Sequence, residues 1–167
     1  WDISKKRLLK RTPKQQYSVW SLGVEASSRR VIASTGWEDG SAGEVIRWDA
    51  GTGRILWRRI IGTTSQLAVS RQGSFFVSAK RFLEKRRTSD GALLRRVASP
   101  GAGQLALSPD GRRLACAAGL LLIKDTTTLK TLLSVRVPNI DVHKVAYIPA
   151  RKWIVCCGHL AKRTTPD

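Results

Sequence analysis

The chain has 167 residues, of which 30 are basic and 12 are acidic, and its formal net charge at pH 7 is +18. Hydrophobic residues make up 42% of the sequence, which supplies a folded core and excludes a wholly disordered chain. No apolar run approaches the roughly 20 residues that a membrane-spanning helix needs. The basic excess favours polyanionic partners such as RNA, although charge that only keeps a protein in solution would look the same.

From the N-terminus onward, the sequence consists of short strands. Runs of about 5–7 residues rich in Val, Ile, Leu and Phe are separated by Gly, Asp, Pro and Ser, and no long helical pattern interrupts them. One unit of four such strands recurs. Complete copies are predicted at 18–60, 65–98 and 104–137, with a half copy at 142–158 and the end of another at 1–11.

The first hairpin of each unit is the clearest repeat. Leu67–Gly73 and Leu105–Gly111 each begin with an apolar strand and end in a turn, and Val24–Ser28 and Val145–Ala150 are weaker copies. The segment Ser108-Pro109-Asp110-Gly111 suits a tight turn, because Pro fixes φ and Gly accepts a positive φ. These hairpins predict antiparallel pairing at the start of every unit.

A second recurrent element is a strand that ends in Asp and continues into a polar turn. The best copy runs from Trp48-Asp49 through Gly53, and Ser89-Asp90 and Lys124-Asp125 are read as its counterparts. Asp and Thr side chains can bond to the backbone of such turns. The residues assigned to strand ends and turns are therefore Trp48, Asp49, Asp90 and Asp125.

Trp48-Asp49, Trp1-Asp2 and the hairpin at 108–115 resemble the strand endings and first hairpins of the WD repeat. The resemblance covers nearly the whole chain and implies an all-β fold, a β-propeller of four-stranded antiparallel blades spanning 1–167, with about three complete blades plus a split terminal blade. The family's Gly-His pair is missing at each blade start. Its buried polar network is thus mostly absent, and Ser34 and Trp48 are the candidates for a remnant.

A second resemblance points to a different function on the same fold. Trp48–Trp57 is also similar to the repeat of quinoprotein-type propellers, which implies an enzyme with a redox cofactor. The adjacent pair Cys156-Cys157 occurs in enzymes of that kind, but small residues that pack at a strand end explain it as well. With only 12 acidic residues, mostly in turns, the sequence offers little for such a cofactor site.

The sequence allows two arrangements of the blades, a small closed ring or a piece of a larger one. Residues 1–11 could complete the half-blade at 142–158 and close a ring of about four blades. Alternatively, the chain is a piece of a larger ring, because seven blades of about 40 residues need roughly 280. We favour the piece, whose open strand edges would promote pairing with another chain.

The basic residues recur in register with the repeat. In a propeller the first hairpins lie on one common face, so the sequence predicts a basic face with few acidic residues nearby. Aromatic side chains are not interleaved with this charge, which favours contacts to phosphate over contacts to bases. Arg58, Arg59, Arg95 and Arg96 are expected on the outer rim. The residues expected on the basic face are Arg29, Arg30, Arg54, Arg71, Arg112, Arg113, Lys130, Arg151 and Lys152, with Lys5 and Lys6.

Catalysis has no motif in this sequence. No glycine-rich loop is followed by Lys and Ser or Thr, and the two histidines and three cysteines lack metal-ligand spacing. An odd number of cysteines favours a reducing, intracellular compartment. We expect a non-catalytic scaffold without cofactor, metal or membrane span, which binds protein partners in a multi-subunit complex and RNA or another polyanion. A purely structural propeller with incidental charge is the remaining alternative.

Overall fold

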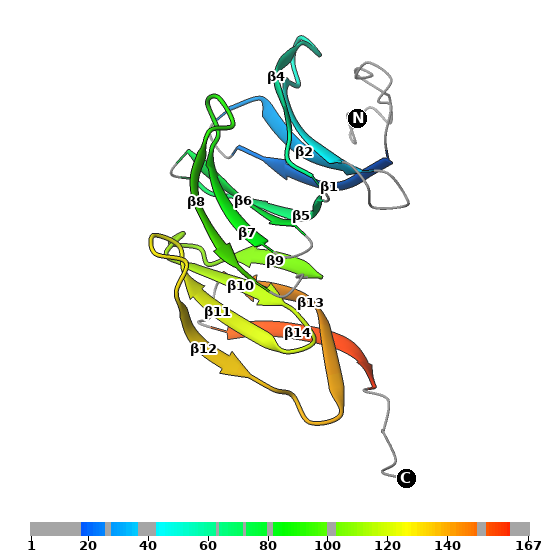
Figure 1. Ribbon diagram of the computed structural model, residues 1–167, viewed down its shortest axis with the longest axis vertical. Coiled ribbons are helices and arrows are strands. Elements are labelled where there is room, and N and C mark those ends of the chain that lie inside the picture. Colours follow the sequence, from blue (N-terminus) through cyan, green and yellow to red (C-terminus); the bar gives the residue numbers. More distant parts are fainter. Residues whose placement is uncertain are drawn as a thin grey trace.

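The computed structural model describes residues 18–25, 28–36, 43–62, 64–71, 73–79, 82–99, 103–149 and 153–160. The regular secondary structure of these residues is entirely β, in fourteen strands (Figure 1). Three sheets have four strands and one has two, and neighbouring strands are antiparallel throughout. Within this part of the chain there is no helix long and apolar enough to cross a membrane.

The strands of each sheet follow one another in chain order. The first sheet contains β1 (Ser18–Val24), β2 (Arg30–Gly36), β3 (Gly43–Asp49) and β4 (Ile55–Ile60). The second contains β5 (Thr64–Val69), β6 (Ser74–Ala79), β7 (Phe82–Arg87) and β8 (Leu93–Ala98). The third contains β9 (Gln104–Leu107), β10 (Arg113–Ala117), β11 (Leu121–Asp125) and β12 (Thr131–Val135), and the last contains β13 (Ile140–Ile148) and β14 (Trp153–Leu160).

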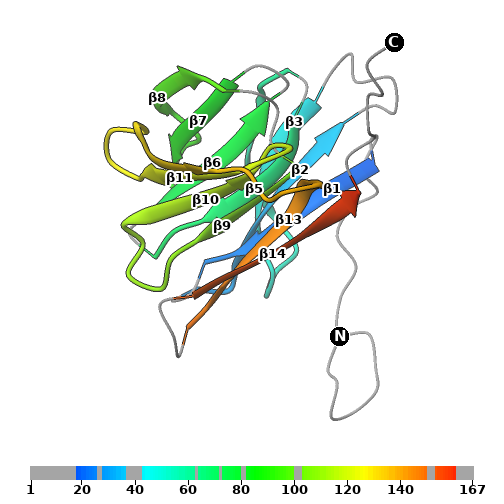
Figure 2. The same cartoon turned by 90° about the horizontal axis from the view of Figure 1, so that it is seen from below.

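The four sheets stack along an open arc. The first strands of the sheets contact one another in sequence, β1 with β5, β5 with β9 and β9 with β13. Figure 1 shows these strands one after another, with β1 and β14 toward opposite ends of the arc, and Figure 2 shows the same sheets from below, where they overlap. This arrangement confirms the predicted all-β fold of four-stranded antiparallel blades and the partial character of the propeller. Residues 1–11, predicted to complete the last blade, lie outside the described residues.

The core lies between successive sheets, because each sheet presents an apolar face to the next. Burial of a Phe, Leu, Ile or Val side chain contributes about 1.5–3 kcal/mol to the stability of the fold. Between the second and third sheets, Phe76 and Leu83 pack with Leu105, Leu114, Cys116, Leu122 and Leu129. Between the first and second, Ile32 and Val45 pack with Leu67 and Phe75. Ala115, Ala117 and Ile123 of the third sheet pack with Val142 and Val145 of β13.

Candidate polyanion-binding face

Each four-stranded sheet brings its first hairpin and its last turn together at one edge. Backbone hydrogen bonds join the two loops in all three sheets. We call the edge formed by the β1–β2, β5–β6 and β9–β10 hairpins and the β3–β4, β7–β8 and β11–β12 turns the hairpin face. The joining bonds run from the amides of Ala50, Thr88 and Thr126 to the carbonyls of Arg29 (2.6 Å), Gly73 (3.0 Å) and Arg112 (3.1 Å).

Threonine side chains reinforce this joint in the second and third sheets. The hydroxyl of Thr88 donates to the carbonyl of Gly73 at 2.9 Å, and that of Thr126 donates to the carbonyl of Gly111 at 2.8 Å. Both threonines are buried. Their hydroxyls therefore fix the hairpin and the turn relative to each other.

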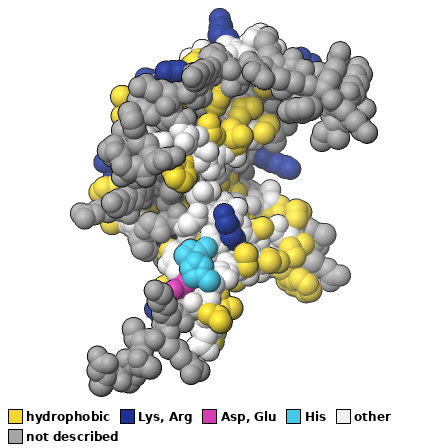
Figure 3. Space-filling view, turned by 90° about the vertical axis from the view of Figure 1, so that its right-hand side faces the viewer, with side chains coloured by type: hydrophobic (Ala, Val, Ile, Leu, Met, Phe, Trp, Pro, Cys, Tyr) yellow, Lys and Arg dark blue, Asp and Glu magenta, His cyan; other side chains and the backbone are white. Residues whose placement is uncertain are grey.

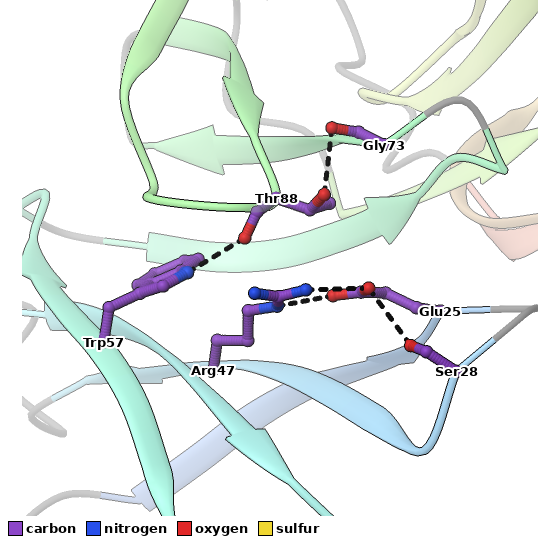
Figure 4. A network of polar contacts seen from close by, with 6 residues as sticks. All are labelled: Glu25, Ser28, Arg47, Trp57, Gly73 and Thr88. Atoms are coloured by element: carbon purple, nitrogen blue, oxygen red, sulfur yellow. Dashed lines mark hydrogen bonds and ion pairs between the residues drawn. The ribbon is translucent and has the colours of Figure 1, made fainter.

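The backbone carbonyls of the same two threonines connect the second sheet to the first and the third sheet to the second. The indole Nε1–H of Trp57 on β4 donates to the carbonyl of Thr88 at 2.9 Å, and the Nζ of Lys85 on β7 donates to the carbonyl of Thr126 at 3.0 Å. Figure 4 shows Trp57 and Gly73 on either side of Thr88. Successive hairpins and turns thus form one continuous surface.

Two aspartates at strand ends organise the turns of the first and third sheets. Asp49 Oδ1 accepts the amide of Thr52 at 2.7 Å, and Asp125 Oδ1 accepts the amide of Thr128 at 2.7 Å. These amide donors, on Thr52 and Thr128, are the main reason that the pKa of each carboxyl lies below its ordinary value. Both side chains are therefore anionic at neutral pH.

The second sheet departs from the predicted register. The amide of Gly91 donates to the carbonyl of Arg87, as Gly53 does to Asp49 in the first sheet, so Arg87 occupies the position of Asp49. Asp90 lies three residues further on, inside the turn, where it accepts the amide of Ala92 at 3.0 Å. A polar Ser-Asp-Gly segment resembles the Asp-led turns of the other sheets, which explains the three-residue misalignment in the sequence reading.

Ser34 and Trp48 do not form a polar network with each other. Both are buried, and neither the Ser34 hydroxyl nor the Trp48 indole N–H has a hydrogen-bond partner within the described residues. Trp48 packs instead against Ala33, Ile46 and Ile55. Its role at the end of β3 is therefore apolar packing.

The structure places the described basic residues of the prediction on the hairpin face, and all of them are exposed. Arg30 and Arg113 begin β2 and β10 and lie opposite Asp49 and Asp125 in the ladder. Their charges contribute to lowering the pKa of those carboxyls. Lys5, Lys6, Arg151 and Lys152 lie outside the described residues. The described members are Arg29, Arg30, Arg54, Arg71, Arg112, Arg113 and Lys130.

Sequence reasoning missed the acidic residues on the same face, because it treated Asp only as a turn former. Asp110, for example, accepts the Ser108 hydroxyl at 2.6 Å and the Arg112 amide at 3.0 Å, and the hydroxyl contact does most to lower its pKa. Among the described residues, and with Arg87 included, eight cations of the hairpin face stand against five carboxylates, a net charge of +3 before the pairing of Glu25 with Arg47 is counted. The five are Glu25, Asp49, Asp90, Asp110 and Asp125. The expectation of few acidic residues nearby was wrong.

Other arginines serve structure or lie away from this face. Arg47 pairs with Glu25 at 2.6 Å and holds the first hairpin against β3 (Figure 4). Buried Glu84 accepts from both Arg86 (2.7 Å) and Arg96 (2.6 Å). The remaining arginines of the predicted rim are exposed on β4 and β8: Arg58, Arg59 and Arg95.

A hollow of about 440 Å³ opens on the hairpin face between the second and third hairpins and the β13–β14 hairpin. Arg71 and Ser108 line it from two different sheets, and Pro149 lines it from the third side. An anion in this hollow would meet the Arg71 guanidinium, whereas the Ser108 hydroxyl already donates to Asp110. Anions bound by arginine are held by short, charge-assisted hydrogen bonds.

The described residues include no cluster of side chains suited to metal binding or thiol chemistry. The three cysteines are free thiols, with Cys116 buried and Cys157 exposed. Burial raises the pKa of the Cys116 thiol to about 12. Within the described part of the chain, no group of three or more His, Cys, Asp or Glu could hold a metal ion.

Comparison with known proteins gives the fold. The sequence matches no family model and no curated protein. By contrast, 774 chains of solved structures match it. One is the β-propeller domain of Cps50 (Swd1) from Myceliophteria thermophila, with a TM-score of 0.69 and 17% identity over 85% of this chain and 48% of that chain. The chain thus spans about half of that domain, and the β-propeller fold predicted from the sequence is confirmed.

Proposed function

We propose that this chain is a non-catalytic, intracellular propeller scaffold that binds protein partners in a larger assembly and binds RNA through its hairpin face. The observation that carries the proposal is the position of exposed Arg29, Arg71 and Arg112 on hairpins that hydrogen bonds join to the neighbouring turns. Three sheets hold these guanidinium groups on one rigid surface. A flexible polyanion can then contact several of them at once.

The arginines of the hairpins are available to a ligand. No ion pair within the described residues uses Arg29, Arg71 or Arg112; the pairs there use Arg47, Arg86, Arg87 and Arg96. The nearby aspartates already accept backbone amides. A guanidinium offers a planar fork of donors that matches the oxygens of a phosphate.

The whole chain adds a long-range attraction. A net charge of +18 raises the local concentration of polyanions and their association rate, whereas the local excess of +3 on the hairpin face limits the strength of contact. Because the contacts fall on phosphates, binding should be strongly salt-dependent and weakly sequence-dependent.

A charge-matched pair of variants tests this proposal. The hairpin variant carries Arg29→Glu, Arg71→Glu and Arg112→Glu, and the control carries Arg58→Glu, Arg59→Glu and Arg95→Glu on β4 and β8. Both lower the net charge equally. Filter binding of a single-stranded RNA is measured across a salt series, where each phosphate contact contributes a log–log slope of about −0.7.

We expect the hairpin variant to lose more than tenfold in affinity and to show a shallower slope, while the control loses less than threefold. Equal losses in the two variants would assign binding to net charge alone. Absence of binding to the unaltered protein at low salt would refute the RNA part. For the non-catalytic part, new cofactor absorbance after reconstitution with a quinone would be the contrary result.

A further inference from the structure

In the described part of the chain the last sheet has two strands, and β14 has a neighbouring strand on one side. Within the described residues β14 pairs only with β13, whereas its counterpart β10 pairs with β9 on one side and β11 on the other. Leu114–Ala117 of β10 are fully buried, but Val155 and Leu160 of β14 are 52% and 79% exposed. Among the described residues, no strand takes the position beside β14 that β11 takes beside β10.

An apolar groove lies next to this edge. It has a volume of about 860 Å³ and runs between the third sheet and the β13–β14 pair. Ile123, Leu132 and Leu133 line it from β11 and β12, and Tyr147 and Ile154 line it from the last sheet. Ser108, Asp110 and Arg113 of the third sheet also line it and make this part of the groove polar. Figure 3 shows hydrophobic side chains at the surface near the histidines of β13 and β14, which lie toward the other end of the β13–β14 ladder from Tyr147 and Ile154. An exposed β edge beside an apolar groove is suited to the addition of a strand.

The interfaces between the first and second sheets and between the second and third sheets indicate which contacts an occupant of the groove would make. In the second sheet Lys85, which lies opposite Arg95, donates to the turn of the next sheet. In the first sheet the donor is Trp57, which lies opposite Arg47. The third sheet has Ile123 opposite Leu133 at this position, so neither side chain can donate a hydrogen bond. An occupant must therefore meet an apolar surface here.

The net charge of the chain determines which side chains are favourable on the side of the occupant that faces water. Apart from His159, β14 has no ionisable side chain other than its two cysteines, so the strand itself repels neither acids nor bases at neutral pH. The net charge of +18 disfavours a basic segment and attracts an acidic one. An occupant with apolar residues toward the groove and acidic residues toward water satisfies both conditions.

We propose that β14 and this groove bind an amphipathic, acidic β-hairpin from a partner protein, whose first strand pairs antiparallel with β14. The hairpin takes the place that β11 and β12 hold beside β10. Its inward side chains pack on Ile123 and Leu133, and its backbone pairs with the peptide groups along the β14 edge. This docking surface meets the hairpin face at Arg113, but Arg29, Arg71 and Arg112 do not line the groove.

The probe is a synthetic peptide with the sequence of residues 121–135, in which Lys124→Leu keeps the side that faces the groove apolar, as Leu122 is, and Ile123→Glu and Lys130→Glu supply the acidic character on the side that faces water. In the protein this segment is the hairpin that covers β10. A scrambled peptide of the same composition is the control. Binding to the full chain is measured by titration calorimetry, and the binding site by hydrogen exchange of the amides of 153–160.

We expect the peptide, and not its scrambled form, to slow exchange along β14. Leu133→Glu places a carboxylate in the groove and should weaken binding at least tenfold. Leu94→Glu on β8 is the matched control, since Leu94 and Leu133 are 45% and 53% exposed, and it should bind as the unaltered protein does. Both side chains are half exposed, and thermal unfolding checks that both variants fold.

Three results would overturn the proposal: no calorimetric binding, protection confined to other strands, or equal loss in the two leucine variants. Protection of the β14 amides that rises with protein concentration, without peptide, would assign the edge to a second copy of the chain instead. None of these results bears on RNA binding, because the RNA assay depends on Arg29, Arg71 and Arg112.

Discussion

Leu22, Leu67 and Leu105 occupy the same position in the first strands of three successive sheets, three residues before the amide that closes each hairpin. Leu67 and Leu105 are each 5% exposed, whereas Leu22 is 62% exposed. The side chain and strand type are identical, so the difference comes from the neighbouring sheet. Leu67 packs between the first and second sheets and Leu105 between the second and third, whereas no described sheet precedes β1. An apolar side chain of a first strand is therefore buried where another sheet packs against it.

The first prediction tests this difference directly. Leu105→Ala should lower the free energy of unfolding by about 2–5 kcal/mol, because it removes buried methyl groups and leaves a cavity. Leu22→Ala should change it by less than about 0.5 kcal/mol, as exposed substitutions usually do. Chemical denaturation of both variants gives the two values. A loss at Leu22 as large as that at Leu105 would show that another surface covers β1.

The second prediction concerns the hydrogen bond between sheets that Trp57 donates to Thr88. Trp57→Phe removes the donor and keeps an aromatic ring near Phe75, whose centroid lies 5.9 Å from that of Trp57. We expect a loss of about 1 kcal/mol, the usual contribution of such a bond. Trp20→Phe on β1, where the side chain is 47% exposed, is the control. Equal decreases in the unfolding midpoint of the two variants would contradict a stabilising hydrogen bond from Trp57 to Thr88.

The third prediction concerns the turn carboxylates and has the smallest effect. Because folding lowers the pKa of Asp125, chiefly through the Thr128 amide, its contribution to stability is present above the ordinary value of 3.8 and is lost as pH falls through the folded value. The amide resonance of Thr128 should therefore titrate with a midpoint below 3.8. Asp125→Asn should abolish this titration, and a midpoint of 3.8 or higher in the unaltered protein would contradict the contact.

Much of the fold follows from local patterns in the sequence. Short apolar runs between turn formers gave the strands and their antiparallel order, since strand length and turn chemistry are local properties. Equivalent positions were harder to assign. The sequence pattern places the start of the first hairpin copy at Val24, because an apolar residue three positions before a Ser resembles the segment that starts at Leu67. The structural counterpart of Leu67 is Leu22. Asp90 was displaced for a similar reason, since an acidic residue suits several positions of one turn.

The basic face illustrates a different limit. Sequence periodicity located its arginines, because residues at equal positions of a repeat point the same way. Periodicity in basic residues could not reveal the opposing charge, since Glu25 and Asp110 belong to hairpins rather than to the Asp-led turns from which the repeat was read. Nor could it identify the groove beside β14, because its lining residues come from two different sheets that pack against each other.

The bonds that Trp57 and Lys85 donate to the turns of the following sheets give the array a direction. Each donor precedes its acceptor in the chain, by 31 residues for Trp57 and Thr88 and by 41 for Lys85 and Thr126. During synthesis, when N-terminal parts fold first, the donor is already in place as the acceptor emerges. Removal of the last sheet leaves both bonds intact, whereas removal of the first deprives the carbonyl of Thr88 of its donor. Truncation from the two ends is thus unequal, and the chain should tolerate shortening from its C-terminal side better.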